Sequence, residues 1–248
     1  MRALIAWLRF ILVILSMAML IIAVSLFYFI SLNFIRNYMR RLWSRCLLAS
    51  VGARINIVGC NLKDIDLKNT LLVSNHISWL DTVIMLRLCY LCYIGKIEML
   101  KWPLLNMIIK AGGTIFIDRK NKRQIFEINQ HVADLLKNGA TVGLYPEGTT
   151  SDGRQVLPFK APILEAARIA GSKVIPVVLS YRKEDDQLAT EVSFSKVSWF
   201  TTVMNTLYLK NLVVNVTILP PVNAADFASR DVLSEYLYNQ ISSNYPIN

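Results

Sequence analysis

One histidine and one aspartate stand at a spacing that suits general base catalysis. His76 follows the apolar run Leu71–Val73, and Asp81 lies five residues later in a second apolar segment. A neutral imidazole titrates at about pH 6.5 and can accept a proton, while a carboxylate fixes its tautomer and stabilises the imidazolium. Residues five apart on one helix point about 140° apart. The pair therefore meets only if His76 lies in a loop and Asp81 in the first helical turn after it.

The same residues also permit a simpler interpretation. Ser78 and Asp81 have the spacing of a capping box before an apolar helix, so spacing alone leaves Asp81 as either a helix cap or the partner of the base. The chain has two histidines. Because His131 falls in a polar segment expected to be an exposed helix, His76 is the better candidate for the base.

A second group lies around Arg119. The apolar run Thr114–Ile117 is entered through Gly112 and Gly113 and left through Asp118 and Arg119. A guanidinium at the end of a strand suits a bidentate contact with a phosphate. The alternative is a solvated charge run, because further basic residues follow.

A third group is the turn Pro146-Glu147-Gly148-Thr149, which ends another apolar run. Turns rich in Gly, Ser and Thr can offer backbone N–H groups to an anion, and Lys160 downstream adds a cation. An ordinary surface loop is the alternative. All three groups follow short apolar strands, which is where the ligand crevice of an α/β sheet lies.

Alternating apolar runs predict the elements that position these groups. We expect strands at 54–59, 70–74, 91–95, 114–118, 141–145, 174–180 and 212–219, and helices near 79–88, 98–111, 122–137, 160–170, 197–209 and 229–243. Pro176 suggests an edge or a bulge in its strand. The apolar helix 197–209 is either core or a contact with membrane or acyl chain. The pattern predicts an α/β fold, a mixed sheet flanked by helices.

The N-terminal quarter differs from the rest of the chain. No charged residue occurs between Phe10 and Ile35, and this run is long enough for a helix to span a bilayer, which takes about 20 residues. A secretory signal peptide normally has a shorter apolar core. We expect two parts: a membrane-embedded helical anchor with a basic flank at 1–50, transmembrane or re-entrant, and a catalytic domain at 51–248.

Charge is distributed in keeping with this division. Residues 1–63 hold eight basic residues and no acidic one, whereas the remaining 185 hold 19 basic and 17 acidic. A basic stretch around an apolar run favours anionic lipid over nucleic acid. The arginines from Arg36 to Arg45 predict a catalytic domain on the cytoplasmic side of a membrane, the inner membrane in a bacterium. Cys89 and Cys92 lack a second pair and are expected to be buried thiols, with no metal site.

In combination, these groups resemble the motifs of the lysophosphatidate acyltransferase family. The resemblance covers about residues 54–220 in family order. The matching residues are Asn75, His76 and Asp81; Gly113, Thr114, Phe116, Ile117, Asp118 and Arg119; Pro146, Glu147, Gly148 and Thr149; and Ile175, Pro176 and Val177. One departure is that Phe159-Lys160 runs into Ala161-Pro162 where the family often has a glycine, which puts a phosphate role for Lys160 in doubt.

The resemblance implies acyl transfer from acyl-CoA or acyl-carrier protein to the free hydroxyl of 1-acyl-glycerol-3-phosphate, giving phosphatidate. His76 would be the base and Asp81 its orienting partner. Substrate-binding roles would fall to Asn75, Arg119, Glu147, Gly148, Thr149 and Lys160. No metal or prosthetic group is implied, and the partners are the bilayer, the lysophospholipid and the acyl donor.

Two alternatives remain at this point. The acceptor could be another lyso-lipid, such as a lyso-ornithine lipid or a lysophospholipid with a head group, because the motifs would barely change. The chain could also be a non-catalytic membrane-binding relative, although intact His76 and Asp81 argue against that. Acyl-chain length, choice of donor and oligomeric state have no signal in the sequence.

Overall fold

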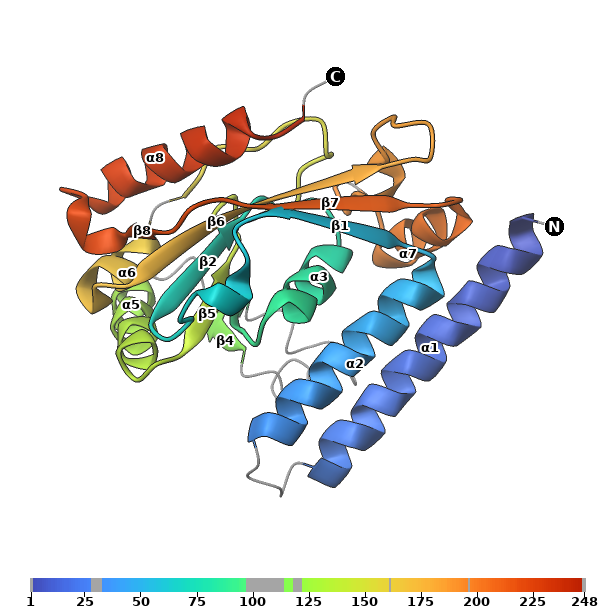
Figure 1. Cartoon of the computed structure of the whole chain (residues 1–248), viewed down its shortest axis with the longest axis horizontal. Coiled ribbons are helices and arrows are strands. Elements are labelled where there is room, and N and C mark those ends of the chain that lie inside the picture. Colours follow the sequence, from blue (N-terminus) through green and yellow to red (C-terminus); the bar gives the residue numbers. More distant parts are fainter. Residues whose placement is uncertain are drawn as a thin grey trace.

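A mixed β-sheet forms the centre of the molecule (Figure 1). The computed structural model describes the chain except residues 1, 28–32, 97–113, 118–121, 161, 196 and 247–248. Within the described residues the sheet has eight strands in the order β1-β7-β6-β2-β5-β3-β4, and β8 also pairs with β6. The strands are β1 (Arg54–Gly59), β2 (Thr70–Ser74), β3 (Cys92–Lys96), β4 (Ile115–Ile117), β5 (Thr141–Leu144), β6 (Lys173–Arg182), β7 (Val213–Ile218) and β8 (Val222–Asn223).

Parallel pairing brings two of the sequence motifs to the same edge of the sheet. β2 is parallel to both β5 and β6, and Val73 stands level with Leu144 and with Pro176. Every residue of β2 and β5 is buried, as expected for strands covered on both faces. The chain therefore leaves β2 towards His76 beside the point where it leaves β5 towards Glu147.

Most helices of the catalytic part lie within one or two residues of their predicted ranges, whereas the helix predicted at 160–170 begins at Leu164. The α-helices with described bounds are α1 (Arg2–Phe27), α2 (Asn33–Val51), α3 (Leu80–Leu88), α5 (Lys122–Lys137), α6 (Leu164–Ala170), α7 (Trp199–Tyr208) and α8 (Arg230–Ser243), with short 3-10 helices η1 (Leu62–Asp64), η3 (Thr190–Val192) and η4 (Ala224–Asp226). The predicted helix at 98–111 lies outside the described residues. The prediction of a mixed sheet flanked by helices is confirmed.

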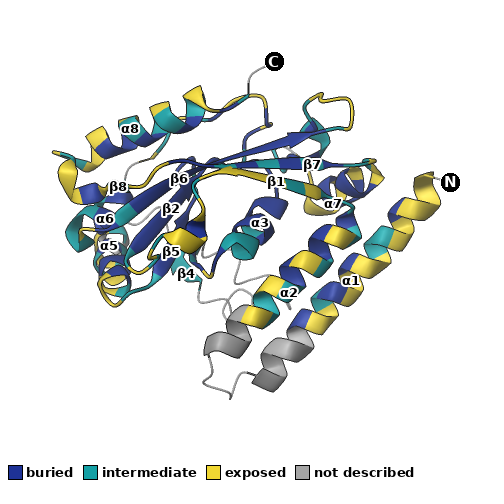
Figure 2. Ribbon diagram, viewed as in Figure 1, coloured by how far each residue is buried: buried dark blue, intermediate teal, exposed yellow. Residues whose placement is uncertain are grey.

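The N-terminal part is a pair of helices, α1 and α2, and the basic residues from Arg36 to Arg45 lie within α2. α1 packs against α2, which returns antiparallel beside it (Figure 1). On α1 the buried apolar residues Ala6, Val13 and Leu20 recur every seven positions, and Ser16 is buried between them, so only a narrow stripe of the described helix faces the protein. Most of the other described side chains of α1 up to Leu20 are exposed (Figure 2), and most of these exposed side chains are large and apolar. Its residues Arg2–Leu20 are long and apolar enough to cross a membrane, with a mean hydropathy of 2.4.

Pro176 lies inside the sheet, so the edge strand, one of the two alternatives expected for it, is wrong. β6 runs between β2 and β7. β7 pairs with Val177–Arg182 and β8 pairs with Lys173 and Val174, so Pro176 falls between the two partners. At that point neither antiparallel ladder requires an N–H from β6, and a proline is tolerated.

Candidate active site

His76 and Asp81 meet at the carboxyl end of β2. His76 Nδ1 lies 2.7 Å from Asp81 Oδ2, and the His76 side chain is 23% exposed while that of Asp81 is fully buried. Because an ionised carboxylate only accepts hydrogen bonds, the proton of a neutral His76 belongs on Nδ1 and Nε2 is left as the acceptor. The imidazole thus has one nitrogen fixed by the protein and one available for a substrate proton.

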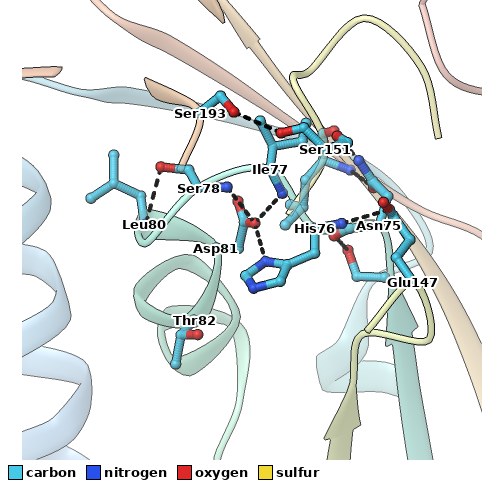
Figure 3. Close-up of polar contacts among 12 residues, drawn as sticks. Asn75, His76, Ile77, Ser78, Leu80, Asp81, Thr82, Glu147, Ser151 and Ser193 are labelled. Carbon is cyan, nitrogen blue, oxygen red and sulfur yellow. Dashed lines mark hydrogen bonds and ion pairs between the residues drawn. The ribbon is translucent and has the colours of Figure 1, made fainter. Parts of the chain in front are cut away.

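Asp81 serves as both a cap and the partner of His76, so the two interpretations of its spacing are compatible. Its Oδ2 also accepts hydrogen bonds from the backbone N–H groups of Ile77 and Ser78, at 2.7 and 2.8 Å (Figure 3). The Ser78 hydroxyl in turn accepts from Leu80 N–H at 3.3 Å. The start of α3 therefore holds the carboxylate, and the carboxylate holds the loop that carries His76.

The backbone of His76 is fixed by the turn that follows β5. His76 N–H donates to Glu147 Oε1 at 2.8 Å, and His76 C=O accepts from Ser151 N–H at 2.7 Å. Further along the loop, Ile77 C=O accepts from Phe194 N–H at 3.1 Å. The first and third sequence motifs are thus joined directly by hydrogen bonds (Figure 3).

Glu147 is buried, and this changes its protonation. Burial raises the pKa of Glu147 to about 8, although hydrogen bonds from the His76 and Leu157 backbone N–H groups oppose the shift. Because desolvation penalises the charged form, a large share of the Glu147 carboxyl groups is neutral at pH 7.

Three tyrosines complete the site, and the sequence patterns do not single them out. The ring of Tyr145 stacks on the imidazole of His76, with centroids 4.2 Å apart and an interplanar angle of 14°, and Tyr93 continues the stack behind Tyr145. Tyr181, on β6, donates its hydroxyl proton to Asp81 Oδ1 at 2.5 Å. Burial raises the pKa of Tyr181 well above the ordinary value, so this hydroxyl remains a donor.

Asn75 connects the loop that carries His76 to the neighbouring strand β6. Its side chain is buried and bonds to the backbone of β6: Nδ2 donates to Leu179 C=O and Oδ1 accepts from Leu179 N–H, both at 2.8 Å. This pair of hydrogen bonds to a neighbouring strand accounts for the asparagine without a substrate. Asn75 therefore helps to position the loop, and its substrate contact stays a prediction.

The other predicted binding residues are distributed around the turn after β5. Gly148 has φ +70°, a conformation that favours glycine, and its N–H donates to Tyr145 C=O at 3.1 Å. Thr149 and Lys160 are exposed, and the Lys160 backbone N–H binds Pro146 C=O at 2.8 Å. Arg119 lies outside the described residues, so its phosphate contact stays a prediction.

No cluster of three or more His, Cys, Asp or Glu side chains that could hold a metal occurs within the part of the chain that the structure describes. All four cysteines are free thiols. Cys89 is buried, and burial raises its pKa to about 12, which makes it an unreactive thiol at neutral pH.

Known proteins are similar to this chain in both sequence and fold. The acyltransferase family model matches residues 54–180. A 1-acyl-sn-glycerol-3-phosphate acyltransferase of Neisseria gonorrhoeae is 33% identical over 171 residues, which cover 69% of this chain and 67% of that protein. A lyso-ornithine lipid O-acyltransferase of Brucella abortus is 29% identical over 94% of this chain and 92% of its own length.

A solved structure with the same fold is the 1-acyl-sn-glycerophosphate acyltransferase PlsC from Thermotoga maritima. It superposes with a TM-score of 0.73 over 98% of this chain and 95% of that chain, at 17% sequence identity. The family model and the relatives show that the chain is an O-acyltransferase. The chain belongs to the lysophosphatidate acyltransferase family, as the order of its motifs predicts.

Proposed function

We propose that this protein is a membrane-bound enzyme that acylates the free hydroxyl of 1-acyl-glycerol-3-phosphate and so produces phosphatidate. The acyl donor is the thioester of acyl-CoA or acyl-carrier protein. The observation that carries the proposal is the contact between His76 Nδ1 and Asp81 Oδ2, which leaves Nε2 as a partly exposed base. Because the thioester is already activated, the reaction needs no metal or prosthetic group.

The reaction follows from this geometry. His76 Nε2 takes the proton of the acceptor hydroxyl as its oxygen attacks the thioester carbonyl, and a tetrahedral intermediate forms. When the intermediate collapses, the C–S bond breaks, and the proton on the imidazolium passes to the departing sulfur. Asp81 stabilises the imidazolium between these two steps. The products are an ester and a free thiol.

The choice of acceptor depends on the phosphate. Lysophosphatidate carries a phosphate that a guanidinium can bind bidentately, and Arg119 is our candidate for that contact. A second acceptor, a lyso-ornithine lipid, is favoured by a separate observation: the Brucella abortus relative aligns with nearly the whole chain. A lyso-ornithine lipid has no phosphate, so the role of Arg119 separates the two.

We also propose that α1 and α2 enter the membrane as a hairpin, with both ends on the side of the catalytic domain. Arg9 of α1 donates to Leu207 C=O at 3.0 Å and to Leu209 C=O at 2.7 Å. The Arg9 guanidinium also packs against Gly52: one of its nitrogens lies 2.5 Å from the position that a Cβ at Gly52 would take. These contacts tie the beginning of α1 to the end of α7, which supports a re-entrant anchor over a single crossing. The predicted cytoplasmic location of the catalytic domain is retained.

A thioester-release assay on the full chain in nanodiscs tests the proposed function. The donors are a long-chain acyl-CoA and the matching acyl-carrier protein, and the acceptors are 1-acyl-glycerol-3-phosphate and a lyso-ornithine lipid. We expect free thiol and phosphatidate from the wild type, and from His76→Ala only a residual rate about 10³-fold or more lower. His131→Ala is the matched control, because His131 is exposed on α5.

The outcomes separate the alternatives. Product from the lyso-ornithine lipid alone would mean that this lipid, and not lysophosphatidate, is the acceptor. Equal activity of Arg119→Ala on lysophosphatidate would remove the phosphate contact from the proposal. A wild-type rate in His76→Ala would overturn the assignment of the base.

A further inference from the structure

Exposed apolar side chains gather in a second place besides α1. Val197, Trp199 and Phe200, at the beginning of α7, are 42%, 38% and 50% exposed. Among the described residues outside α1, no other four-residue stretch holds three exposed large apolar side chains. We call these three residues the α7 edge.

The α7 edge is continuous with the exposed face of α1. The ring of Phe200 packs edge-on against Phe10 of α1, with centroids 5.9 Å apart, and Phe10 packs in the same way against Trp7 at 5.8 Å. Trp7 is itself half exposed. A chain of aromatic contacts therefore passes from the first turns of α1 onto α7 through Phe10 and Phe200.

The exposure of the α7 edge does not come from a poorly packed helix end. Ser198 caps α7 by accepting a hydrogen bond from Thr201 N–H at 3.1 Å, and Val203, Met204 and Leu207 are buried on the inner side. The beginning of α7 is thus fixed, and it holds its aromatic side chains outward. A fixed apolar patch of this kind marks an interaction surface.

The same segment is bonded to the loop that carries His76. The Thr202 hydroxyl donates to Ser193 C=O at 3.2 Å, and the Ser193 hydroxyl donates to Ser151 C=O at 2.7 Å. Ser193 forms an isolated bridge with Ser78, and Phe194 N–H donates to Ile77 C=O. Two short links therefore connect α7 to Ile77 and Ser78, the residues whose N–H groups bind Asp81.

We propose that the α7 edge is a second lipid-contacting surface, which rests with α1 in the bilayer and holds the His76 loop at the membrane surface. The inference rests on the membrane attachment proposed above. A bilayer is the occupant that the observations favour, because the patch continues the face of a helix with a mean hydropathy of 2.4. Tryptophan is also enriched where membrane and water meet.

The sequence permits a direct test on the unmodified chain. Trypsin cleaves after Lys196 and Lys210, so that α7 and its edge are released as the peptide 197–210, and cleavage after Arg230 releases α8 as the peptide 231–248. The wild-type protein is placed in nanodiscs that contain a phosphatidylcholine with a diazirine on its acyl chain. After illumination, the labelled peptides are identified by mass spectrometry.

We expect label on the α1 peptides and on peptide 197–210, several-fold above the level on the α8 peptide, which is the internal control. Fragmentation should place the label of peptide 197–210 at positions 197–200. Replacing Trp199 and Phe200 together by serine should lower the labelling of that peptide several-fold.

Each other result has a distinct meaning. Label on α1 without label on peptide 197–210 would overturn the α7 surface and leave the membrane attachment intact. Absence of label from both would overturn the attachment and the inference together. Equal labelling of the α7 and α8 peptides would also count against the proposal, because the proposal does not bring α8 into contact with the bilayer.

Discussion

Tyr181 donates a hydrogen bond to Asp81 Oδ1 at 2.5 Å from a strand one hundred residues further along the chain. The other carboxylate oxygen receives His76 Nδ1 and two backbone N–H groups. Both oxygens of a fully buried carboxylate are therefore held, each from a different element of the fold. Because Asp81 cannot rotate without breaking these bonds, the imidazole of His76 keeps one orientation.

Tyr181→Phe should lower kcat about tenfold and leave the KM for the acceptor nearly unchanged. The loss of the hydroxyl leaves Asp81 Oδ1 without its partner in a buried site, which costs about 1–3 kcal/mol. We expect kcat to respond because the carboxylate that orients the base is less well fixed. Steady-state kinetics in nanodiscs, together with thermal unfolding, measures both effects.

Tyr245→Phe is the matched control for this prediction. Tyr245 is also buried, and its hydroxyl donates to Gly153 C=O rather than to Asp81. It should lose stability with little change in kcat. If both variants lose the same stability and the same kcat, Tyr181 has no special part in positioning the base.

Asp81→Asn should reduce kcat by about 10³–10⁴-fold, because an amide neither stabilises the imidazolium nor maintains the tautomer of His76. The variant also turns an N–H₂ group or a weaker acceptor towards the N–H groups of Ile77 and Ser78, so its thermal stability should fall. The thioester-release rate gives the first effect, and thermal unfolding gives the second.

Ser78→Ala separates capping from catalysis. It removes the hydroxyl that accepts from Leu80 N–H and leaves the carboxylate in place. The expected cost is about 0.5–2 kcal/mol of stability, with a much smaller loss of kcat than in Asp81→Asn. A comparable loss of kcat in the two variants would mean that Asp81 acts only as a cap.

The stack of Tyr145 on His76 yields a further pair of variants. Tyr145→Ala removes a ring that lies 4.2 Å from the imidazole, and we expect a cost of about 3–5 kcal/mol in stability and a lower kcat. Tyr145→Phe preserves the ring and should remain close to the wild type in both. The measurements are thermal unfolding and the thioester-release rate; a low kcat in Tyr145→Phe would assign the effect to the hydroxyl instead of the ring.

Local periodicity accounts for how much of the fold was predictable. The bounds of β1, β2 and α5 coincide with their predicted ranges, because each is a clear run of period two, period 3.6 or continuous burial. α2 was also predictable from the sequence, because its apolar residues form a helical stripe: Trp43, Leu47, Leu48 and Val51. However, the arginines of the same segment, from Arg36 to Arg45, favour the interpretation of a basic flank.

Apart from the motif residues themselves, which include Glu147, the contacts of the site were predictable only where they are local. His76 and Asp81 are five residues apart, so one turn of chain brings them together. Tyr181 reaches Asp81 because β6 pairs with β2 in a defined register, and Tyr145 reaches His76 because β5 pairs with β2 on the other side. No spacing in the sequence encodes such contacts, since they depend on which strands become neighbours.

Glu147 makes the stability of the protein depend on pH. Its ordinary pKa is 4.5, and burial raises the pKa to about 8 in the folded state. The folded protein thus binds this proton more tightly than the unfolded chain does. The resulting contribution to stability is fully present below about pH 4.5 and is lost as the pH rises through about 8, with a slope of at most about 1.4 kcal/mol per pH unit.

Glu147→Gln cannot ionise, so it lacks this pH dependence while it retains an oxygen to accept from His76 N–H. We expect its thermal stability relative to the wild type to rise steadily between pH 5 and pH 8, in the window set by the shifted pKa. The measurement is thermal unfolding in nanodiscs across that range, with Glu235→Gln, at an exposed position on α8, as the control. Parallel curves for Glu147→Gln and the wild type would mean that Glu147 titrates as it does in the unfolded chain. A rising difference would mean that the carboxyl beside the His76 backbone is held largely neutral, so that the anionic acceptor meets less negative charge there.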